Sequence, residues 1–217
     1  MIFDHNHPAY RAKWISRPNG KWNGAFYYAK EIYKFIIPSV NTDRNWVLLN
    51  VEGFCWDHSI VFIHNNKFPS LYDWLKDYND LILVCGVPET CEKVAHLGTP
   101  IYLPLSVDVE YVKTFITEKT RGTAFVGRRS KRTNIEFPVG TEFIENMMRT
   151  ELLRRMAMYK NVYAVGRTAI EAKILGCEVL PYDPRFPDPE RWKIFNNKEA
   201  ACMLQKLIDE VDYDLFA

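Results

Sequence analysis

The fold is decided by residues 161–181, which read NVYAVGRTAIEAKILGCEVLP. The branched and aromatic residues over 161–166 predict a buried strand that ends at a glycine. Apolar residues at helical spacing over 168–175 predict a helix, and Gly176 follows directly, where a glycine commonly ends a helix. A second apolar run over 177–181 predicts the next strand. A strand, a glycine turn, a helix and a further strand are the repeating unit of a parallel α/β sheet.

The same alternation of apolar runs and helical patterns extends over the rest of the chain. Further strands are predicted at residues 46–51, 59–64, 81–86, 100–104 and 123–127, and helices at 25–36, 68–78, 88–97, 141–159 and from 197 onward. Short apolar runs between helices indicate parallel strands that are covered on both faces. Residues 12–16 and the glycine-containing loop 18–24 are interpreted as the first strand and turn of the series.

These elements predict an α/β protein made of two small, Rossmann-like, doubly wound halves with a cleft between them. The polar stretch 117–121 is interpreted as the linker between the halves. We therefore expect an N-terminal domain at residues 1–115 and a C-terminal domain at residues 116–217.

The composition predicts a globular protein of nearly balanced charge. The 217 residues are 47% hydrophobic and 25% charged, with 28 Lys and Arg against 27 Asp and Glu. This balance excludes a disordered chain and a strongly basic nucleic-acid coat. No run of 18 apolar residues is present and residues 1–5 lack the basic start of a signal peptide, so we expect a cytoplasmic protein without a membrane span. The five cysteines show no C-x-x-C spacing and are interpreted as buried free thiols, with no metal site.

Small and basic residues follow the ends of two predicted strands. The residues that we expect to face an anion there are Gly166, Arg167 and Thr168, at and after the end of the strand at 161–166, and Arg128 and Lys131, after the strand at 123–127. Parallel sheets bind ligands beyond the carboxyl ends of their strands, and the start of a helix attracts negative charge. Arginine and lysine side chains add charge-assisted hydrogen bonds to phosphate. This pattern predicts a phosphate site.

Two interpretations of these residues remain open. Glu171 lies one helical turn beyond Thr168, where a carboxylate can accept hydrogen bonds from ribose hydroxyls. The same two residues match a Thr-x-x-Glu capping box, which is a purely local device. The basic segment 119–132, which includes Lys119 and Arg121, fits a phosphate site, a solvated loop or a nucleic-acid contact.

The order of these motifs resembles the C-terminal half of the GT-B-fold glycosyltransferases, which use nucleotide-sugar donors. In that family a strand ending in Val-Gly-Arg, here residues 126–128, is followed closely by a lysine, here Lys131. A later helix carries Glu-Ala, here residues 171–172, and leads to a glycine and a strand. Residues 80–86 and 103–108 resemble the end of the family's N-terminal half, so the likeness covers roughly residues 80–183.

The resemblance implies a metal-independent glycosyltransferase whose donor is a nucleoside-diphosphate sugar, with uridine as the family's usual base. It implies that Arg128 and Lys131 grip the donor diphosphate and that Glu171 holds the ribose. The N-terminal half would bind an acceptor that the sequence leaves unnamed. No separate cofactor is expected, because basic side chains and a helix start can replace a metal ion.

An inverting transferase needs a general base near the acceptor hydroxyl. Glu52 and His64 are the candidates, since Glu52 follows the predicted strand 46–51 and His64 ends the predicted strand 59–64, and Asp57 and His58 are further ones. The chain departs from the family at Tyr163, where many members carry a glutamate eight positions before the helix glutamate, and it is shorter than usual members. A non-catalytic nucleotide-binding protein on the same scaffold is therefore an alternative function. A DNA-contacting or DNA-modifying protein that uses the basic segment is another.

Overall fold

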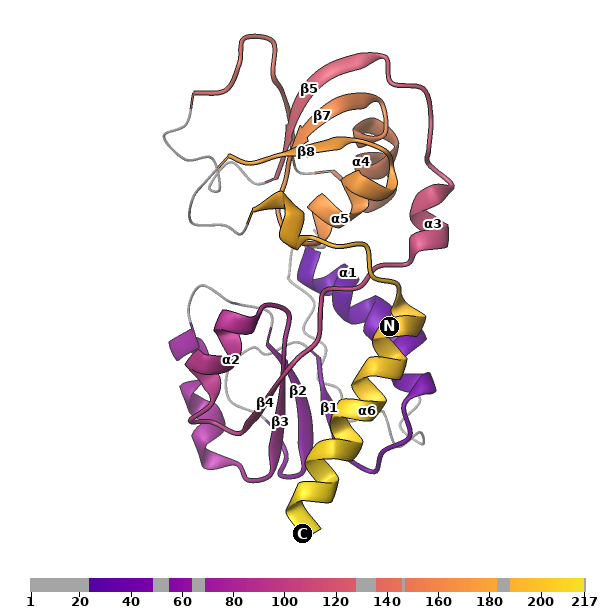
Figure 1. Ribbon diagram of the computed structural model, residues 1–217. Helices are drawn as coiled ribbons and strands as arrows, with labels where there is room; N and C mark the ends of the chain where they lie inside the picture. The colour runs from indigo at the N-terminus through magenta and orange to yellow at the C-terminus, as the bar shows by residue number, and fades with distance from the viewer. Residues whose placement is uncertain are drawn as a thin grey trace. The chain divides into compact units, whose positions relative to one another are not determined.

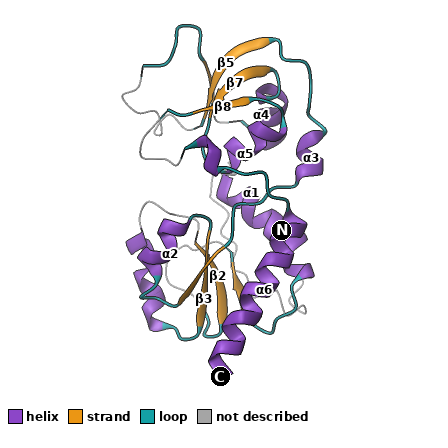
Figure 2. Cartoon of the chain, in the orientation of Figure 1, coloured by secondary structure: helices purple, strands orange, loops and turns teal. Residues whose placement is uncertain are grey.

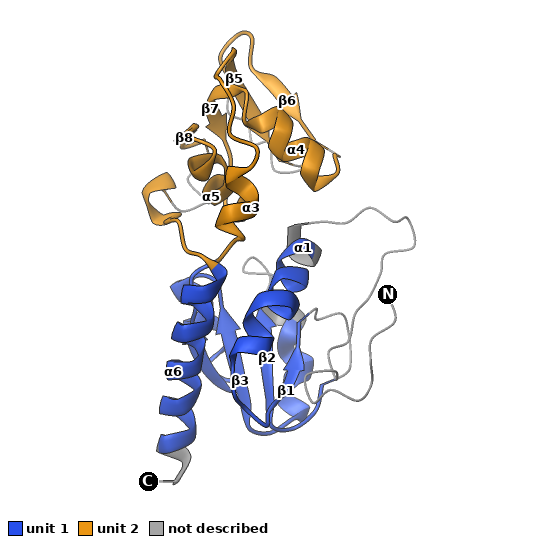
Figure 3. Cartoon of the chain, turned by 90° about the vertical axis from the view of Figure 1, so that its right-hand side faces the viewer, with its two compact units in different colours: residues 1–105, 197–217 blue, residues 106–196 orange. Residues whose placement is uncertain are grey.

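The computed structural model describes residues 24–48, 55–63, 69–127, 136–145, 147–182 and 188–216. The chain forms two compact units (Figure 3): unit 1 consists of residues 1–105 and 197–217, and unit 2 of residues 106–196. Each unit holds one four-stranded parallel sheet with helices, so the predicted α/β class with two parallel sheets is confirmed. The division differs from the predicted boundary, because the last helix belongs to unit 1 and residues 106–115 belong to unit 2.

The sheet of unit 1 contains strands in their sequence order, as labelled in Figure 1; Figure 2 draws the strands in orange and the helices in purple. They are β1 (Asn45–Val47), β2 (Ser59–Ile63), β3 (Leu81–Cys85) and β4 (Thr99–Tyr102), and every neighbouring pair is parallel. β2 and β3 are buried at every position. Complete burial explains why these strands read as continuous apolar runs in the sequence.

Alternate residues of the strands pack against different helices. Odd-numbered residues, among them Val61, Leu83 and Cys85, share a core with η4 (Pro69–Asp77), a 3₁₀-helix, and lie beside α2 (Pro88–Val94). Even-numbered residues face the other way. On that face the ring of Phe62 meets Tyr28 of α1 (Gly24–Glu31) at 6.4 Å and Trp46 at 6.3 Å between centroids. The period-two alternation of a strand thus builds one core on each face of the sheet.

The C-terminal helix α6 (Asn197–Phe216) packs on the N-terminal part of the chain, which is why it belongs to unit 1. Its neighbours there are η2 (Ile32–Ile36), a π-helical continuation of α1, and η3 (Ile37–Ser39). Buried residues of α6, such as Leu204 and Ile208, form its apolar face. Gln205 also accepts a hydrogen bond from the Asn41 backbone N–H at 2.6 Å.

Unit 2 has a different strand order. Its elements are α3 (Val109–Lys113), β5 (Arg121–Val126), β6 (Glu142–Ile144), α4 (Arg149–Met156), β7 (Tyr159–Tyr163), α5 (Arg167–Ile174), β8 (Glu178–Leu180) and η6 (Pro189–Arg191) (Figure 1; β6 is labelled in Figure 3). The sheet order is β6-β5-β7-β8, and all pairs are parallel. The long helix predicted over 141–159 is wrong, because its first part is the edge strand β6 and only 149–156 is helical.

Lys119 joins the ends of two helices in unit 2. Its ammonium donates hydrogen bonds to the carbonyl oxygen of Ala157, just after α4, at 2.7 Å and to that of Leu175, just after α5, at 2.6 Å. The last carbonyls of a helix have no partner within it and carry partial negative charge. Lys119 therefore has a structural role in the packing of α4 and α5.

Candidate functional site

The strand order of unit 2 creates a topological switch point between β5 and β7. The chain leaves β5 toward β6 on one side of the sheet, whereas it leaves β7 through α5 toward β8 on the other side. The connections after these two neighbouring strands therefore lead to strands at opposite edges of the sheet. Open α/β sheets bind ligands at such points. The predicted phosphate residues follow these same two strands in the sequence.

Gly166 forms the turn from β7 into α5. Its dihedral angles, φ 62° and ψ −139°, lie in a region that only glycine adopts readily. The Gly166 carbonyl accepts the first helical hydrogen bonds, from the N–H groups of Ala169 at 3.0 Å and Ile170 at 3.2 Å. Arg167 and Thr168 are the first two residues of α5, whose N–H groups have no partner within a helix. The turn thus presents backbone donors at the carboxyl edge of the sheet.

The capping-box interpretation of Thr168 and Glu171 is wrong. Gly166 occupies the N-cap position, so Thr168 is already the second helical residue and Glu171 the fifth. A capping box needs the hydroxyl at the N-cap and the carboxylate three residues later. The side chain of Glu171 is instead buried, with 6% of its surface exposed, and makes ion pairs.

Two arginines surround the Glu171 carboxylate. Its Oε1 lies 2.8 Å from Nη2 of Arg149 and 3.9 Å from Nη2 of Arg167, and both arginine side chains are about nine-tenths buried. Arg167 is the first residue of α5, and Arg149 is the first residue of α4, the helix that follows β6 in the chain. The three side chains carry a formal charge of +1 and lie at the sheet edge where the glycine turn presents its N–H groups.

Sequence reasoning missed Arg149. The helical pattern predicted over 141–159 hid the boundary between β6 and α4, so this arginine read as one of several on a long helix. Its place at a helix start became visible only with the strand. The ring of Tyr111 on α3 lies 5.6 Å from its guanidinium carbon, in cation–π geometry.

Four predicted site residues lie outside the described residues: Glu52, His64, Arg128 and Lys131. The basic segment 119–132 is not a single loop, since β5 runs through residues 121–126. Arg121 at the start of this strand pairs with Glu142 at 2.8 Å. Lys119 and Arg121 thus lie at the amino end of β5, about 20 Å of strand away from its carboxyl end.

Tyr163 belongs to an aromatic cluster on one face of the unit 2 sheet. Phe125, Phe143 and Tyr163 are in register on three neighbouring strands. Phe137, from the connection between β5 and β6, lies 5.1 Å from the Tyr163 ring and 5.2 Å from the Phe125 ring. Tyr182 closes the group at 5.3 Å from Phe125. The position where many glycosyltransferases of the resembled family carry a glutamate is therefore a packed ring.

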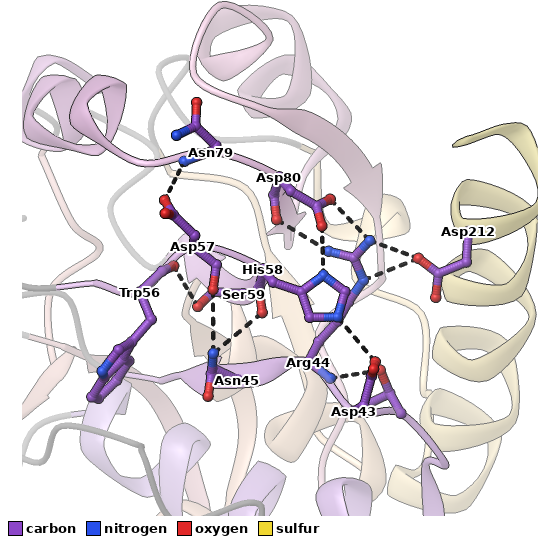
Figure 4. Close-up of polar contacts among 11 residues, drawn as sticks. Asp43, Arg44, Asn45, Trp56, Asp57, His58, Ser59, Asn79, Asp80 and Asp212 are labelled. Atoms are coloured by element: carbon purple, nitrogen blue, oxygen red, sulfur yellow. Dashed lines mark hydrogen bonds and ion pairs between the residues drawn. The ribbon is translucent and has the colours of Figure 1, made fainter. Parts of the chain in front are cut away.

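A second polar cluster lies at the amino edge of the unit 1 sheet (Figure 4). Arg44, His58 and Asp80 each directly precede a strand, so parallel pairing brings them together. The imidazole of His58 lies between two carboxylates, with Nδ1 2.5 Å from Asp80 Oδ2 and Nε2 3.0 Å from Asp43 Oδ1. His58 and Asp80 both have positive φ, 56° and 53°, and their side chains point toward one another (Figure 4).

Arg44 links this cluster to the last helix, α6. Its fully buried guanidinium contacts Asp80 Oδ1 at 3.0 Å and Asp212 Oδ1 of α6 at 2.6 Å. Asp57, another predicted base candidate, accepts a hydrogen bond from the Asn79 N–H at 2.7 Å. Asp57 and His58 thus lie at the sheet edge opposite the strand ends where such sheets bind ligands. The cluster fastens α6 to the sheet.

The ionisable groups of this cluster stabilise one another's charged forms. The hydrogen bond to Asp80 raises the pKa of His58 above its usual 6.5, and the one to Asp43 adds to it. The hydrogen bond from His58 also lowers the pKa of Asp43. Burial pushes the pKa of Asp80 upward, but hydrogen bonds from His58 and Arg44 outweigh burial and leave it lowered.

The cysteines of the chain are unpaired thiols. All five cysteines are free, and Cys55, Cys85 and Cys177 are buried as expected, whereas Cys91 is half-buried and Cys202 is exposed. Burial raises the pKa of the three buried thiols and keeps them protonated. Within the described part of the chain, no group of three or more His, Cys, Asp or Glu side chains could hold a metal ion. No helix among these residues has the length and apolar character for crossing a membrane.

Comparison with known proteins gives no match. Neither a family model nor a curated protein nor a solved structure matches the chain.

Proposed function

We propose that the chain binds a nucleoside-diphosphate sugar at the carboxyl edge of the unit 2 sheet and transfers the sugar to an acceptor. The observation that carries the proposal is the switch point between β5 and β7, with a glycine-initiated helix directly at it. This geometry suits a phosphorylated ligand. The resemblance to GT-B-fold glycosyltransferases supports the sugar donor.

In this proposal the diphosphate meets the first N–H groups of α5, the Thr168 hydroxyl and the Arg167 guanidinium. Arg128 and Lys131, which follow β5 in the sequence, add positive charge. The acceptor hydroxyl forms a bond to the anomeric carbon, while the bond from that carbon to the diphosphate oxygen breaks. The hydroxyl proton passes to a base, and the nucleoside diphosphate leaves with the electron pair of the broken bond. Positive groups at the site stabilise the charge that develops on it.

Unit 1 serves the acceptor in the same proposal. Glu52 and His64 are its candidate bases, and a transferase that retains configuration would need neither. The donor is expected to carry uridine, and the protein to work in the cytoplasm without a metal or other cofactor.

Calorimetric titration with UDP, ADP, GDP and their sugars tests the donor site. Wild type should bind one nucleoside diphosphate at micromolar concentration, and Gly166→Ala should weaken it at least tenfold. Gly176→Ala is the matched control, because Gly176 also has positive φ, 75°, at the other end of α5. Binding by none of the nucleotides, or equal weakening by both substitutions, would count against the site.

A non-catalytic nucleotide-binding protein on this scaffold is the second candidate. Tyr163 favours it, because a ring packed against Phe137 supplies no carboxylate near the transferred sugar. Release of free nucleoside diphosphate from the bound donor, with acceptor mixtures or water, separates the two functions. Turnover would support the transferase, and tight binding without turnover would support the binding protein.

A further inference from the structure

We propose that Arg149 is a positioning residue for Glu171: its ion pair with the carboxylate fixes the orientation in which Glu171 meets the ribose hydroxyls. The inference rests on the proposed function, because ribose reaches this carboxylate only if a nucleotide binds at the edge of the unit 2 sheet. The inference adds Arg149 and its helix α4, which the donor-site motifs do not contain, to the candidate site.

The direction of the Glu171 side chain is set by its helix. Side chains of a helix lean toward its N-terminus, so a glutamate in the second turn of α5 reaches back toward the first. The 3.9 Å distance between its Oε1 and Nη2 of Arg167 agrees with this direction. The closest approach of the carboxylate to each of the two arginines is made by Oε1.

Arg149 provides the shorter of these contacts, and its own position is fixed by α3. The Tyr111 ring covers its guanidinium at 5.6 Å, and the Tyr111 hydroxyl lies 3.1 Å from Oγ1 of Thr150. Asp108 caps α3 by accepting the Tyr111 N–H at 3.0 Å. α3 packs against α5, which carries Glu171. Arg149 and its carboxylate are thus held from both sides.

The charges of this group suit a polyanionic ligand. A buried carboxylate without a partner is costly and would repel a diphosphate. Two guanidinium groups against one carboxylate leave a formal charge of +1 on the three side chains. Arg149 therefore allows an acid to lie beside a phosphate site.

Discrimination between ribose and 2′-deoxyribose tests the inference. Calorimetry on the full chain gives the ratio of Kd for 2′-deoxyUDP to Kd for UDP, with the ADP and GDP pairs measured in parallel. We expect a ratio of at least about ten for wild type, equivalent to about 1.4 kcal/mol. Arg149→Met should lower it below about two, and Arg149→Lys, which keeps one charged donor, should give an intermediate ratio.

Arg154→Met is the matched control, because Arg154 lies on the same helix, is exposed, and only approaches the Phe115 ring, at 5.9 Å. Its ratio should equal that of wild type. If Arg149→Met does not fold, by circular dichroism, the ratio of Arg149→Lys decides alone.

The Kd measurements distinguish failure of the Arg149 inference from failure of the proposed function. A purely structural Arg149 would change the affinities for both sugars equally, so an unchanged ratio in the folded Arg149 variants overturns the inference while nucleotide binding stands. A wild-type ratio near one overturns it as well and removes the ribose role of Glu171. Absence of binding to every nucleotide by folded wild type overturns the proposed function and this inference together.

Discussion

Asp212 of the last helix accepts two hydrogen bonds from the buried guanidinium of Arg44, from Nε at 3.0 Å and from Nη2 at 2.6 Å. The third guanidinium nitrogen, Nη1, donates to the Asp80 carbonyl oxygen at 3.1 Å. One buried arginine therefore connects the amino edge of the unit 1 sheet to the C-terminal helix. The side chain of Asp212 is 35% exposed, so water reaches the carboxylate of the pair but not the buried guanidinium.

Removing either partner should destabilise unit 1, by different amounts. Arg44→Met leaves the carboxylates of Asp80 and Asp212 without their cation, and we expect a loss of roughly 3–5 kcal/mol in the free energy of unfolding. Asp212→Asn leaves Arg44 with Asp80 and should cost about 1–3 kcal/mol. Urea unfolding measures both, and Asp209→Asn on the same helix is the control. Equal stability of Arg44→Met and wild type would contradict the structural role.

The stability of unit 1 should depend on pH through His58. Its pKa is raised in the folded protein, so its contribution is fully present below pH 6.5 and is lost as the pH rises through the folded value. The lowered pKa values of Asp43 and Asp80 act in the opposite sense. Their contribution is present above pH 3.8 and is lost as the pH falls through the folded values. Unit 1 should thus be most stable between about pH 4 and 6.5.

His58→Asn tests this dependence, because asparagine tolerates the positive φ at this position. Thermal unfolding from pH 5 to 9 should show a decline in Tm for wild type that the variant lacks. The side chains of His58, Asp43 and Asp80 are all in contact with solvent, and Asp43 is 89% exposed, so added salt should reduce the decline. The same decline in both proteins would assign it to other groups.

Lys119→Met should loosen the helices of unit 2. The substitution keeps most of the apolar stem but removes the ammonium from the carbonyl groups of Ala157 and Leu175. We expect a loss of about 2–4 kcal/mol, the scale for hydrogen bonds to a charged donor. Hydrogen exchange at the ends of α4 and α5 should become faster. Lys160→Met, at an exposed position of β7, is the control and should leave exchange unchanged.

Phe137→Ala should open the aromatic face of unit 2. The ring contacts Phe125, Phe143 and Tyr163, and its loss should cost about 2–4 kcal/mol, near the lower end of values for buried phenylalanine. Near-ultraviolet circular dichroism reports on the packing of these rings. Val139→Ala, whose side chain is fully exposed, provides the comparison. An unchanged aromatic signal in Phe137→Ala would contradict the packing.

Much of the fold could be predicted from the sequence because most strands are buried on both faces. β2 and β3 are apolar at nearly every position, and the predicted runs at 59–64 and 81–86 contain them. β6 has only three residues at a sheet edge, with Phe143 exposed, so its pattern merged with that of α4. Local periodicity also gave no sign that α6 packs on distant residues of unit 1.

The part of the candidate site that a local turn forms could be predicted from the sequence. Gly166 marked the start of α5, since a strand, a glycine and a helix in series limit the backbone to few conformations. The partner of Glu171 was not predictable, because Arg149 is 22 positions away and reaches it only through the packing of α4 and α5. The ion pairs of His58 depend on strand pairing in the same way.

Unit 1 is built from two separate stretches of the chain, so it begins to be synthesised before unit 2 but is completed after it. The strands β1 to β4 leave the ribosome early, but α6 follows only after all of unit 2 has been translated. Unit 2 is contiguous, and contiguous domains fold as they emerge. Until α6 has been synthesised, Arg44 lacks its ion pair with the carboxylate of Asp212. The first half of the chain to be made is thus the last to be finished, and a nascent chain stalled before residue 197 would expose it to chaperones and proteases.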